Sequence, residues 1–279
     1  LIALEDDLHF FPQYKAVFLY RLSLPPNALA ALRKLEGTLD ETRMIRLNAE
    51  AERTNDYSRA AAQYFGKTET FRRDALLPKI ARWTGRHLEL AGVSLLLSIL
   101  VGVPLGISAS RGGAVGHAIL AVTSAVQTIP SLALLALLVP VPFFGISART
   151  AIAALFLYGL LPIVRNTAAG LQDIAQPIRE SAIALGLTSA ARLRQVYLPI
   201  ASRTILAGIK TSAVLNIGTA TLAALIGAGG LGEPIISGLN LNDHATILQG
   251  AIPAALLALL VQWSFELLDR ILIPKGLRL

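Results

Sequence analysis

The chain has 279 residues, of which 54% are hydrophobic and 15% charged, with a net charge of +7 and no cysteine. This composition excludes a disordered chain and a disulfide scaffold. Residues 1–86 hold 14 basic and 11 acidic side chains, whereas the 193 residues after them hold only 11 and 7, so a polar head precedes an apolar body. No basic run with interleaved aromatic residues points to nucleic acid, so we assign the surplus basic residues to the loops of a membrane protein.

In the head, residues 1–4 have the pattern of a short strand, and three short helices follow. Thr38 and Glu41 have the spacing of a capping box at the start of the second helix. One strand and three small helices cannot close a core. Residues 1–70 are therefore predicted to be a short α/β fragment of a larger domain, so that the chain is a piece of a longer one, with a linker over 71–83.

The body contains five apolar segments that are each long enough to cross a bilayer, which needs about 20 residues. Pro130 is expected to break the second of them, as membrane helices tolerate. The predicted fold is a mainly α, polytopic membrane protein with a transmembrane domain over 84–272 and a tail over 273–279. The five spans are expected over 88–109, 117–139, 148–169, 200–226 and 245–268.

The charges of the loops predict which side of the membrane each loop occupies. Nine basic residues fall on one side of the predicted spans and only Arg149 on the other. The positive-inside rule makes the richer side cytoplasmic, so the C-terminus is expected inside and the N-terminus outside. The nine are Arg111, Arg165, Arg179, Arg192, Arg194, Arg203, Arg270, Lys275 and Arg278.

Several polar side chains lie inside the predicted spans. Such groups either line a cavity or join helices through hydrogen bonds, and both interpretations stay open here. The candidates for a pathway lining are Gln127, Pro130, Asn216, Thr219 and Thr221. Five helices do not easily enclose a pathway alone, so we expect a dimer of the chain, with ten spans.

The segment 176–199, QPIRESAIALGLTSAARLRQVYLP, predicts two short helices that lie flat on the cytoplasmic surface. Pro177 is suited to a helix start, and Gly186 can take the left-handed conformation that ends a helix. Thr188 or Ser189 can cap the helix that follows. On spacing alone, this loop is either interfacial structure or a docking site.

The residues of this segment resemble the EAA loop of ABC importer permeases. That loop has an acid, small residues, a glycine six positions after the acid, and Leu-Pro near its end. The resemblance implies a coupling helix that inserts into a separate ATPase subunit, which hydrolyses the ATP, while this chain is no enzyme and binds no cofactor or metal. The matching residues are Glu180, Ser181 in place of the usual Ala, Ala182, Gly186, Leu198 and Pro199.

Two further segments, QTIPS over 127–131 and TATLAALIGAGGLG over 219–232, resemble the osmoprotectant subgroup of these permeases. That resemblance implies import of glycine betaine, choline or carnitine; another amine, ergothioneine or a methionine-like substrate is the alternative. Residues 227–232 also fit the G-x-G-x-x-G dinucleotide pattern, but they follow a predicted span and lack the βαβ context. We expect a tight turn there. No P-loop motif occurs in the chain.

The head, through residues 5–14, residues 47–48 and its final helix, resembles the C-terminal end of the substrate-binding proteins that serve the same permeases. The resemblance makes Tyr14 a candidate for an aromatic cage around a trimethylammonium group, with ordinary packing as the alternative role. A binding domain works outside the membrane, which agrees with the N-terminus predicted by the loop charges.

The expected protein is thus a multi-pass permease of a bacterial inner membrane, with an ATPase subunit, a second permease subunit and a substrate-binding protein or domain as partners, and no nucleic acid. Two other classes of protein compete with this hypothesis. A secondary transporter would need coupling-ion carboxylates within its spans, where only Glu89 and Glu266 occur, both toward helix ends. A membrane-anchored receptor would not need the Glu180–Gly186 pattern.

Overall fold

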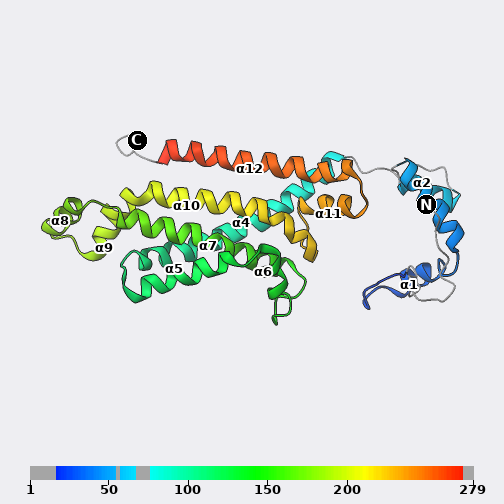
Figure 1. Cartoon of the computed structure of the whole chain (residues 1–279), viewed down its shortest axis with the longest axis horizontal. Helices are drawn as coiled ribbons and strands as arrows, with labels where there is room; N and C mark the ends of the chain where they lie inside the picture. The colour runs from blue at the N-terminus through cyan, green and yellow to red at the C-terminus, as the bar shows by residue number, and fades with distance from the viewer. Residues whose placement is uncertain (1–16, 55–56, 67–75, 273–279) are drawn as a thin grey trace, which may run out of the picture. The chain divides into compact units, whose positions relative to one another are not determined.

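The computed structural model describes residues 17–54, 57–66 and 76–272 (Figure 1). The chain divides into two compact units, Leu1–Arg73 and Asp74–Leu279, which we describe separately. The expected strand over 1–4, Tyr14 and the tail over 273–279 lie outside the described residues. All the elements in the described ranges are helical, so the polytopic α class is confirmed, whereas the α/β character of the head finds no support there.

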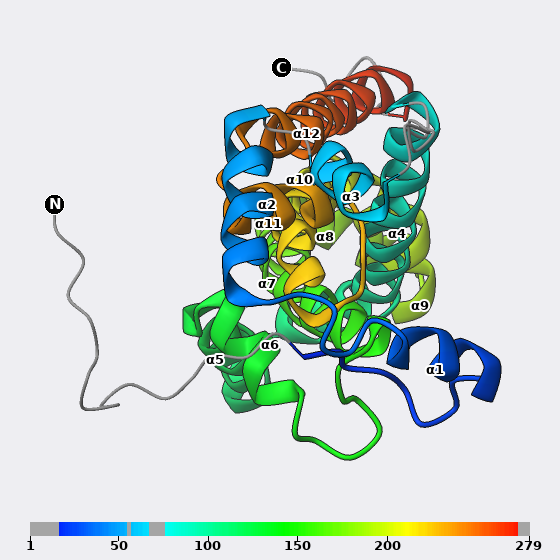
Figure 2. The same cartoon turned by 90° about the vertical axis from the view of Figure 1, so that its right-hand side faces the viewer.

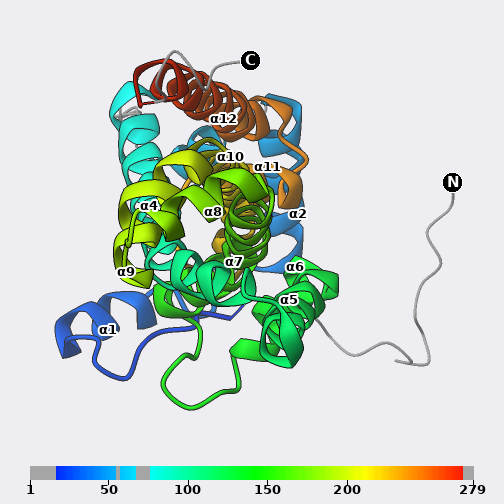
Figure 3. The same ribbon diagram turned by 90° about the vertical axis from the view of Figure 1, so that its left-hand side faces the viewer.

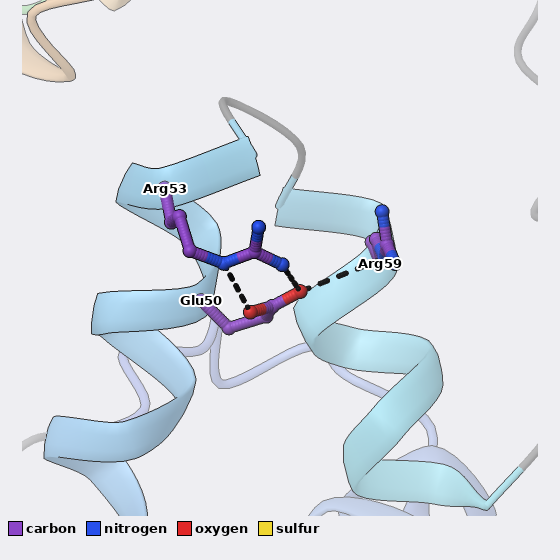
Figure 4. Close-up of polar contacts among 3 residues, drawn as sticks. All are labelled: Glu50, Arg53 and Arg59. Carbon is purple, nitrogen blue, oxygen red and sulfur yellow. Dashed lines mark hydrogen bonds and ion pairs between the residues drawn. The ribbon is translucent and has the colours of Figure 1, made fainter.

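The first unit contains three short helices, α1 (Pro26–Arg33), α2 (Glu41–Thr54) and α3 (Tyr57–Phe65). Glu50 joins α2 to α3, as Figure 4 shows, because its carboxylate accepts hydrogen bonds from Arg53 at 2.8 and 3.0 Å and lies 3.6 Å from Nε of Arg59. The hydrogen bond from Arg53 lowers the pKa of Glu50. These contacts lie at the surface, where ion pairs contribute little to stability.

The start of α2 differs from the predicted capping box. The backbone N–H of Arg43 donates to Oδ1 of Asp40 at 2.7 Å, so Asp40 is the capping residue. The hydroxyl of Thr38 instead donates to the carbonyl of Leu35 at 2.7 Å. The physical reason is that the helix begins at Glu41, which puts the short carboxylate of Asp40 within reach of the third helical N–H.

The second unit has four helices that are long and apolar enough to cross a membrane, and a bent pair that would make a fifth span. Three of the four are α4 (Leu76–Ala109), α7 (Ala148–Gln172) and α12 (His244–Leu272). The other runs from Ser189 to Ile226 and combines α9 (Ser189–Ala191), the π-helical η1 (Arg192–Tyr197), α10 (Leu198–Thr219) and the 3-10 helix η2 (Ala220–Ile226). The remaining helices are α5 (Gly113–Thr128), α6 (Ser131–Leu138), α8 (Gln176–Ala184) and α11 (Gly232–Asn240).

The bent pair consists of α5 and α6, which meet at an angle of 98°. Pro130 stands between them with φ −55° and ψ 138°, outside the helical region, so the predicted break at this proline is confirmed. Tyr158 of α7 holds the break in place: its carbonyl accepts from the Gln127 amide at 3.0 Å, and its hydroxyl donates to the Ile129 carbonyl.

The bent pair carries the chain back along the bundle. The amide of Gln172, at the end of α7, donates to the carbonyl of Ser110, just after α4, at 3.4 Å. The C-terminal ends of α4 and α7 therefore lie together, and α5 with α6 must lead from that end to the start of α7. Figure 1 shows this path, with α8 and α9 at one end of the bundle and α6 and α11 at the other.

The most buried of the spanning helices is α7, which packs against both α4 and α10. Small residues let these helices approach closely, as is common in membranes. A Cβ on Gly106 of α4 would lie 2.5 Å from Cβ of Thr167, and the hydroxyl of Ser98 donates to the Phe156 carbonyl of α7 at 2.9 Å. By contrast, α12 is largely exposed and lies on the opposite side of the bundle from α5 (Figures 1 and 3).

Candidate functional site

The loop over 176–199 stands at one end of the bundle, nearest the viewer in Figure 3. Its first helix, α8, ends at Gly186, whose φ of +73° lies in the left-handed region. The N–H of Leu187 donates to the Ala182 carbonyl at 3.4 Å, and the N–H of Gly186 donates to the Ile183 carbonyl at 2.9 Å. This pair of bonds is a Schellman motif, so the predicted glycine-terminated helix is confirmed.

The motif residues of α8 divide between its buried and exposed sides. Ala182 is buried, at 3% exposure, whereas Glu180 and Ser181 are exposed. The amide of Gln176 donates to Oε1 of Glu180 at 3.0 Å and holds its carboxylate on the surface. The same helix and its end expose three large apolar side chains, Ile178, Ile183 and Leu185.

The second helix of the loop begins at Thr188, whose hydroxyl accepts from the N–H of Ala191 at 3.3 Å; of the two predicted caps, this is the one used. The chain then makes a π-helical turn, η1, before Leu198 and Pro199 open α10. Turns of this kind are rare and often stand at functional sites. The loop thus presents an acid and apolar side chains beside the start of a spanning helix, a surface that suits docking of another protein.

The five pathway candidates do not gather at one site. Gln127 is bonded to α7, and Pro130 caps α6. Thr219 and Thr221 donate to the carbonyls of Leu215 and Gly218, both at 2.8 Å, within their own chain segment. Asn216 is fully buried, and its amide has no partner among the described residues. A role in a pathway therefore stays a prediction for these residues.

One small pocket brings together parts of the two motifs. It lies where α6, α7 and the junction of α10 with η2 meet. Of the five pathway candidates only Thr219 lines it, and the QTIPS segment contributes Ser131. Its lining consists of Ser131, Leu135, Ala151, Ala154, Leu155, Tyr158, Thr219 and Ala223.

At the other end of the bundle, which Figure 2 faces, the glycine-rich segment forms the expected turn. Gly227, Gly229 and Gly230 have φ of 66°, 84° and 92°, so the chain reverses between η2 and α11. In the described part of the chain no strand precedes this turn, so the dinucleotide pattern is accidental.

Two consecutive residues of α4 hold this turn, although neither belongs to a predicted motif. Nε of Arg86 donates to the Ala228 carbonyl at 3.0 Å, while Nδ1 of the fully buried His87 accepts from the N–H of Leu231 at 3.3 Å. Nε2 of His87 donates to the Ile217 carbonyl at 2.9 Å, close to where α10 becomes the 3-10 helix η2. Only the neutral ring can make both bonds. The partners lie over 100 residues away, so no local pattern could have found them.

The two carboxylates that lie within the predicted spans, Glu89 and Glu266, are each paired with a cation. Oε2 of Glu89 lies 2.6 Å from Arg86, and Oε1 of Glu266 on α12 lies 3.1 Å from Nζ of Lys210 on α10. Within the described ranges, no group of three or more His, Cys, Asp and Glu side chains is suited to a metal ion.

A bundle of long apolar helices with a bent helix pair and an exposed two-helix loop before α10 defines a multi-pass membrane protein. Residues 98–275 match the family model described as the binding-protein-dependent transport system inner membrane component. The chain belongs to this family of permease subunits, which are non-enzymatic components of ABC transporters.

Three relatives are each identical to this chain at about two fifths of the aligned residues. The chain is 40% identical to the glycine betaine/carnitine/choline transport system permease protein OpuCB of Bacillus subtilis over 195 residues, or 70% of this chain and 89% of the relative. It is 43% identical to the carnitine transport permease protein OpuCB of Listeria monocytogenes, over 70% and 88%. It is 39% identical to the osmoprotectant import permease protein OsmW of Salmonella typhimurium, over 71% and 94%.

Solved structures agree with the fold. An inward-facing conformation of the MetNI methionine ABC transporter matches with a TM-score of 0.66 at 20% identity, over 74% of this chain and 100% of that one. An amino acid ABC transporter with histidines matches with a TM-score of 0.58 at 18% identity, over 70% and 94%. At these identities the likeness concerns the fold alone.

Proposed function

We propose that this permease imports quaternary-ammonium osmoprotectants of the glycine betaine, choline and carnitine type. The observation that carries the proposal is the likeness to relatives whose names state such substrates, at about 40% identity over nearly their full length. The QTIPS and glycine-rich segments, on which the resemblance first depended, meet at the pocket that Ser131 and Thr219 line.

The proposed ATPase docks on the loop over 176–199, with Glu180 and the apolar side chains of Ile183 and Leu185 as its contacts. These two apolar side chains are 56% and 77% exposed, and the loop is too polar to enter the bilayer. Closure of the ATPase subunits would move α8 and tip the spans between two states that open on opposite sides.

A homodimer is part of the proposal, as are the substrate-binding protein and an N-terminus outside the membrane. The long helix α12 is largely exposed in the single chain, which leaves most of it to lipid or to a second copy. The head over 1–70 would be the end of the binding domain, with Tyr14 in its cage, and this part rests only on the resemblance described for the head in the sequence.

The pairing of Glu89 and Glu266 argues against these two carboxylates as the coupling site of a secondary transporter. A coupling site needs a carboxylate free to bind and release its ion within the span. Glu89 and Glu266 are instead neutralised by Arg86 and Lys210 at 2.6 and 3.1 Å. Methionine is an alternative cargo among importers, because the glycine-rich segment over 219–232 also resembles that of methionine permeases.

The test is uptake by vesicles that hold the permease with its ATPase and binding protein. Labelled glycine betaine, choline, carnitine and methionine are supplied one at a time, with ATP or its non-hydrolysable analogue inside. We expect ATP-dependent uptake of at least one of the first three, competed by the others and unaffected by a proton or sodium ionophore. Uptake of methionine alone would contradict the proposed quaternary-ammonium substrate. Uptake that proceeds without ATP and is abolished by an ionophore would contradict the assignment to ATP-driven importers.

Orientation is tested by introducing single cysteines. Because the chain contains no cysteine, no native cysteine has to be removed first. Cysteines at Ser189 and Asn242, on the two sides of α10, should react with a membrane-impermeant maleimide from inside and outside, respectively. A second pair at Arg111 and Ile146 tests whether α5 and α6 cross the membrane, with Arg111 expected inside. If the cysteines at positions 111 and 146 both react from the same side of the membrane, the five-span topology is contradicted.

A further inference from the structure

Arg179 is the residue that joins the coupling loop to the spans. The loop charges alone marked it only as a cytoplasmic cation. In the fold its guanidinium reaches back from α8 to the end of α7: Nε donates to the Ile174 carbonyl at 3.0 Å, and Nη2 donates to the carbonyls of Leu171 and, at 3.5 Å, Gln172. Its side chain is half-buried by these contacts.

These acceptors explain why an arginine suits the position. Leu171 and Gln172 are the last residues of α7, and the final carbonyls of a helix have no partner within it. A guanidinium offers five donors in a fixed fork and a charge that complements the negative end of the helix dipole. Arg179 is thus a C-terminal cap supplied by another helix.

The same guanidinium also contacts the beginning of the next span. Its carbon Cζ lies 5.5 Å from the ring centroid of Tyr197, the last residue of the π-helical η1, in cation–π contact. Beneath it, the buried side chains of Leu171, Ile174 and Ala201 form an apolar cluster against which Leu193 and Tyr197 pack. One side chain of α8 therefore touches the end of α7 and the start of the helix that leads into α10.

We propose that Arg179 is the positioning residue that transmits movement of α8 to α7 and α10 during the transport cycle. Packed side chains and hydrogen-bond networks can carry energetic coupling between distant sites, and the fork of bonds to α7 with the stack on Tyr197 supplies such a contact. Glu180, the adjacent residue, is exposed and free to meet the ATPase. The two neighbouring residues thus have different roles: Glu180 contacts the ATPase, and Arg179 transmits the movement of α8 to α7 and α10. This role rests on the proposed docking of an ATPase at the loop.

The test uses the complete complex of permease, ATPase and binding protein in vesicles, and measures substrate imported per ATP hydrolysed together with ATPase co-purification. In Arg179→Ala we expect the ATPase to co-purify as with wild type, while substrate imported per ATP falls about tenfold or more, since hydrogen bonds from a charged donor are lost. Arg179→Lys keeps the charge but not the fork and should give an intermediate ratio. Arg111→Ala, which removes an exposed arginine at the same end of the bundle, is the matched control and should leave the ratio unchanged.

A second pair of variants guards against simple misfolding of Arg179→Ala. Tyr197→Phe keeps the ring under the guanidinium and should couple normally, whereas Tyr197→Leu keeps an apolar side chain without the ring and should lower the ratio. A wild-type ratio in both Arg179→Ala and Tyr197→Leu would overturn the proposal, as would loss of transport in strict proportion to loss of bound ATPase, which would make Arg179 a docking residue. If the unmodified complex shows no substrate-dependent hydrolysis, the proposed function fails instead.

Discussion

Replacement of Gly186 by valine is expected to abolish transport while the permease still inserts into the membrane. The physical reason is the backbone, because Gly186 has φ +73° and a Cβ would meet no atom within 4 Å. A residue with a Cβ is destabilised in this region by about 1–2 kcal/mol, and a β-branched one by more. Loss of the left-handed residue breaks the bonds from Leu187 to Ala182 and from Gly186 to Ile183, so α8 unwinds at the end nearest Ile183 and Leu185.

A graded series separates backbone strain from loss of space. Asparagine tolerates the left-handed region better than other residues with a Cβ, so transport should decline in the order Gly186, Gly186→Asn, Gly186→Ala, Gly186→Val. The measurement is substrate-stimulated ATP hydrolysis and ATPase co-purification in vesicles, with permease yield as the folding control. Glu180→Lys should also lower both by reversing a charge at the proposed contact, without strain. Equal transport by the asparagine and valine variants would show that φ at this position does not matter, and normal transport by all variants would make the loop merely interfacial.

A structural feature could be predicted from the sequence when the residues that determine it lie close together along the chain. The apolar segments follow from the hydrophobicity of about 20 consecutive residues, and the break at Pro130 and the glycine end of α8 follow from steric rules that act within a few residues. All three predictions are confirmed. The predicted capping box was wrong by two residues, because Asp40 rather than Thr38 caps the helix that begins at Glu41. Local rules of this kind give the type of an element better than its boundary.

The contacts between helices could not be predicted from the sequence, because they join residues that only the packed fold brings together. His87 bonds to Ile217 and Leu231, which lie 130 and 144 residues along the chain. Arg179 lies only eight residues from Leu171, yet its role depends on how α8 folds back on the end of α7, which no periodicity encodes. Both residues could be identified as polar groups beside spans, but their partners required the packed structure.

Replacement of Gly232 by alanine should prevent correct folding of the end of the bundle that carries the glycine-rich turn. A Cβ at this position would lie 1.8 Å from the carbonyl oxygen of Thr221 and 2.7 Å from its carbonyl carbon. These are backbone atoms of η2, so no side-chain rotation can relieve the overlap, and α11 must move away from η2. Overpacking typically costs about 1–3 kcal/mol, and a clash with backbone belongs at or above the top of that range.

The displacement should spread, because the turn is bound at several points. Moving Leu231 weakens its bond to Nδ1 of His87, and a shift of α11 disturbs its packing on α12. We expect Gly232→Ala to give a much lower yield of monodisperse protein in detergent and a lower Tm than wild type. Gly92→Ala is the matched control, because it adds a Cβ on α4 where nothing lies within 4 Å and where alanine favours a helix. Equal Tm values for the two variants would mean that the turn does not pack against Thr221, and the account of this end of the bundle would then be wrong.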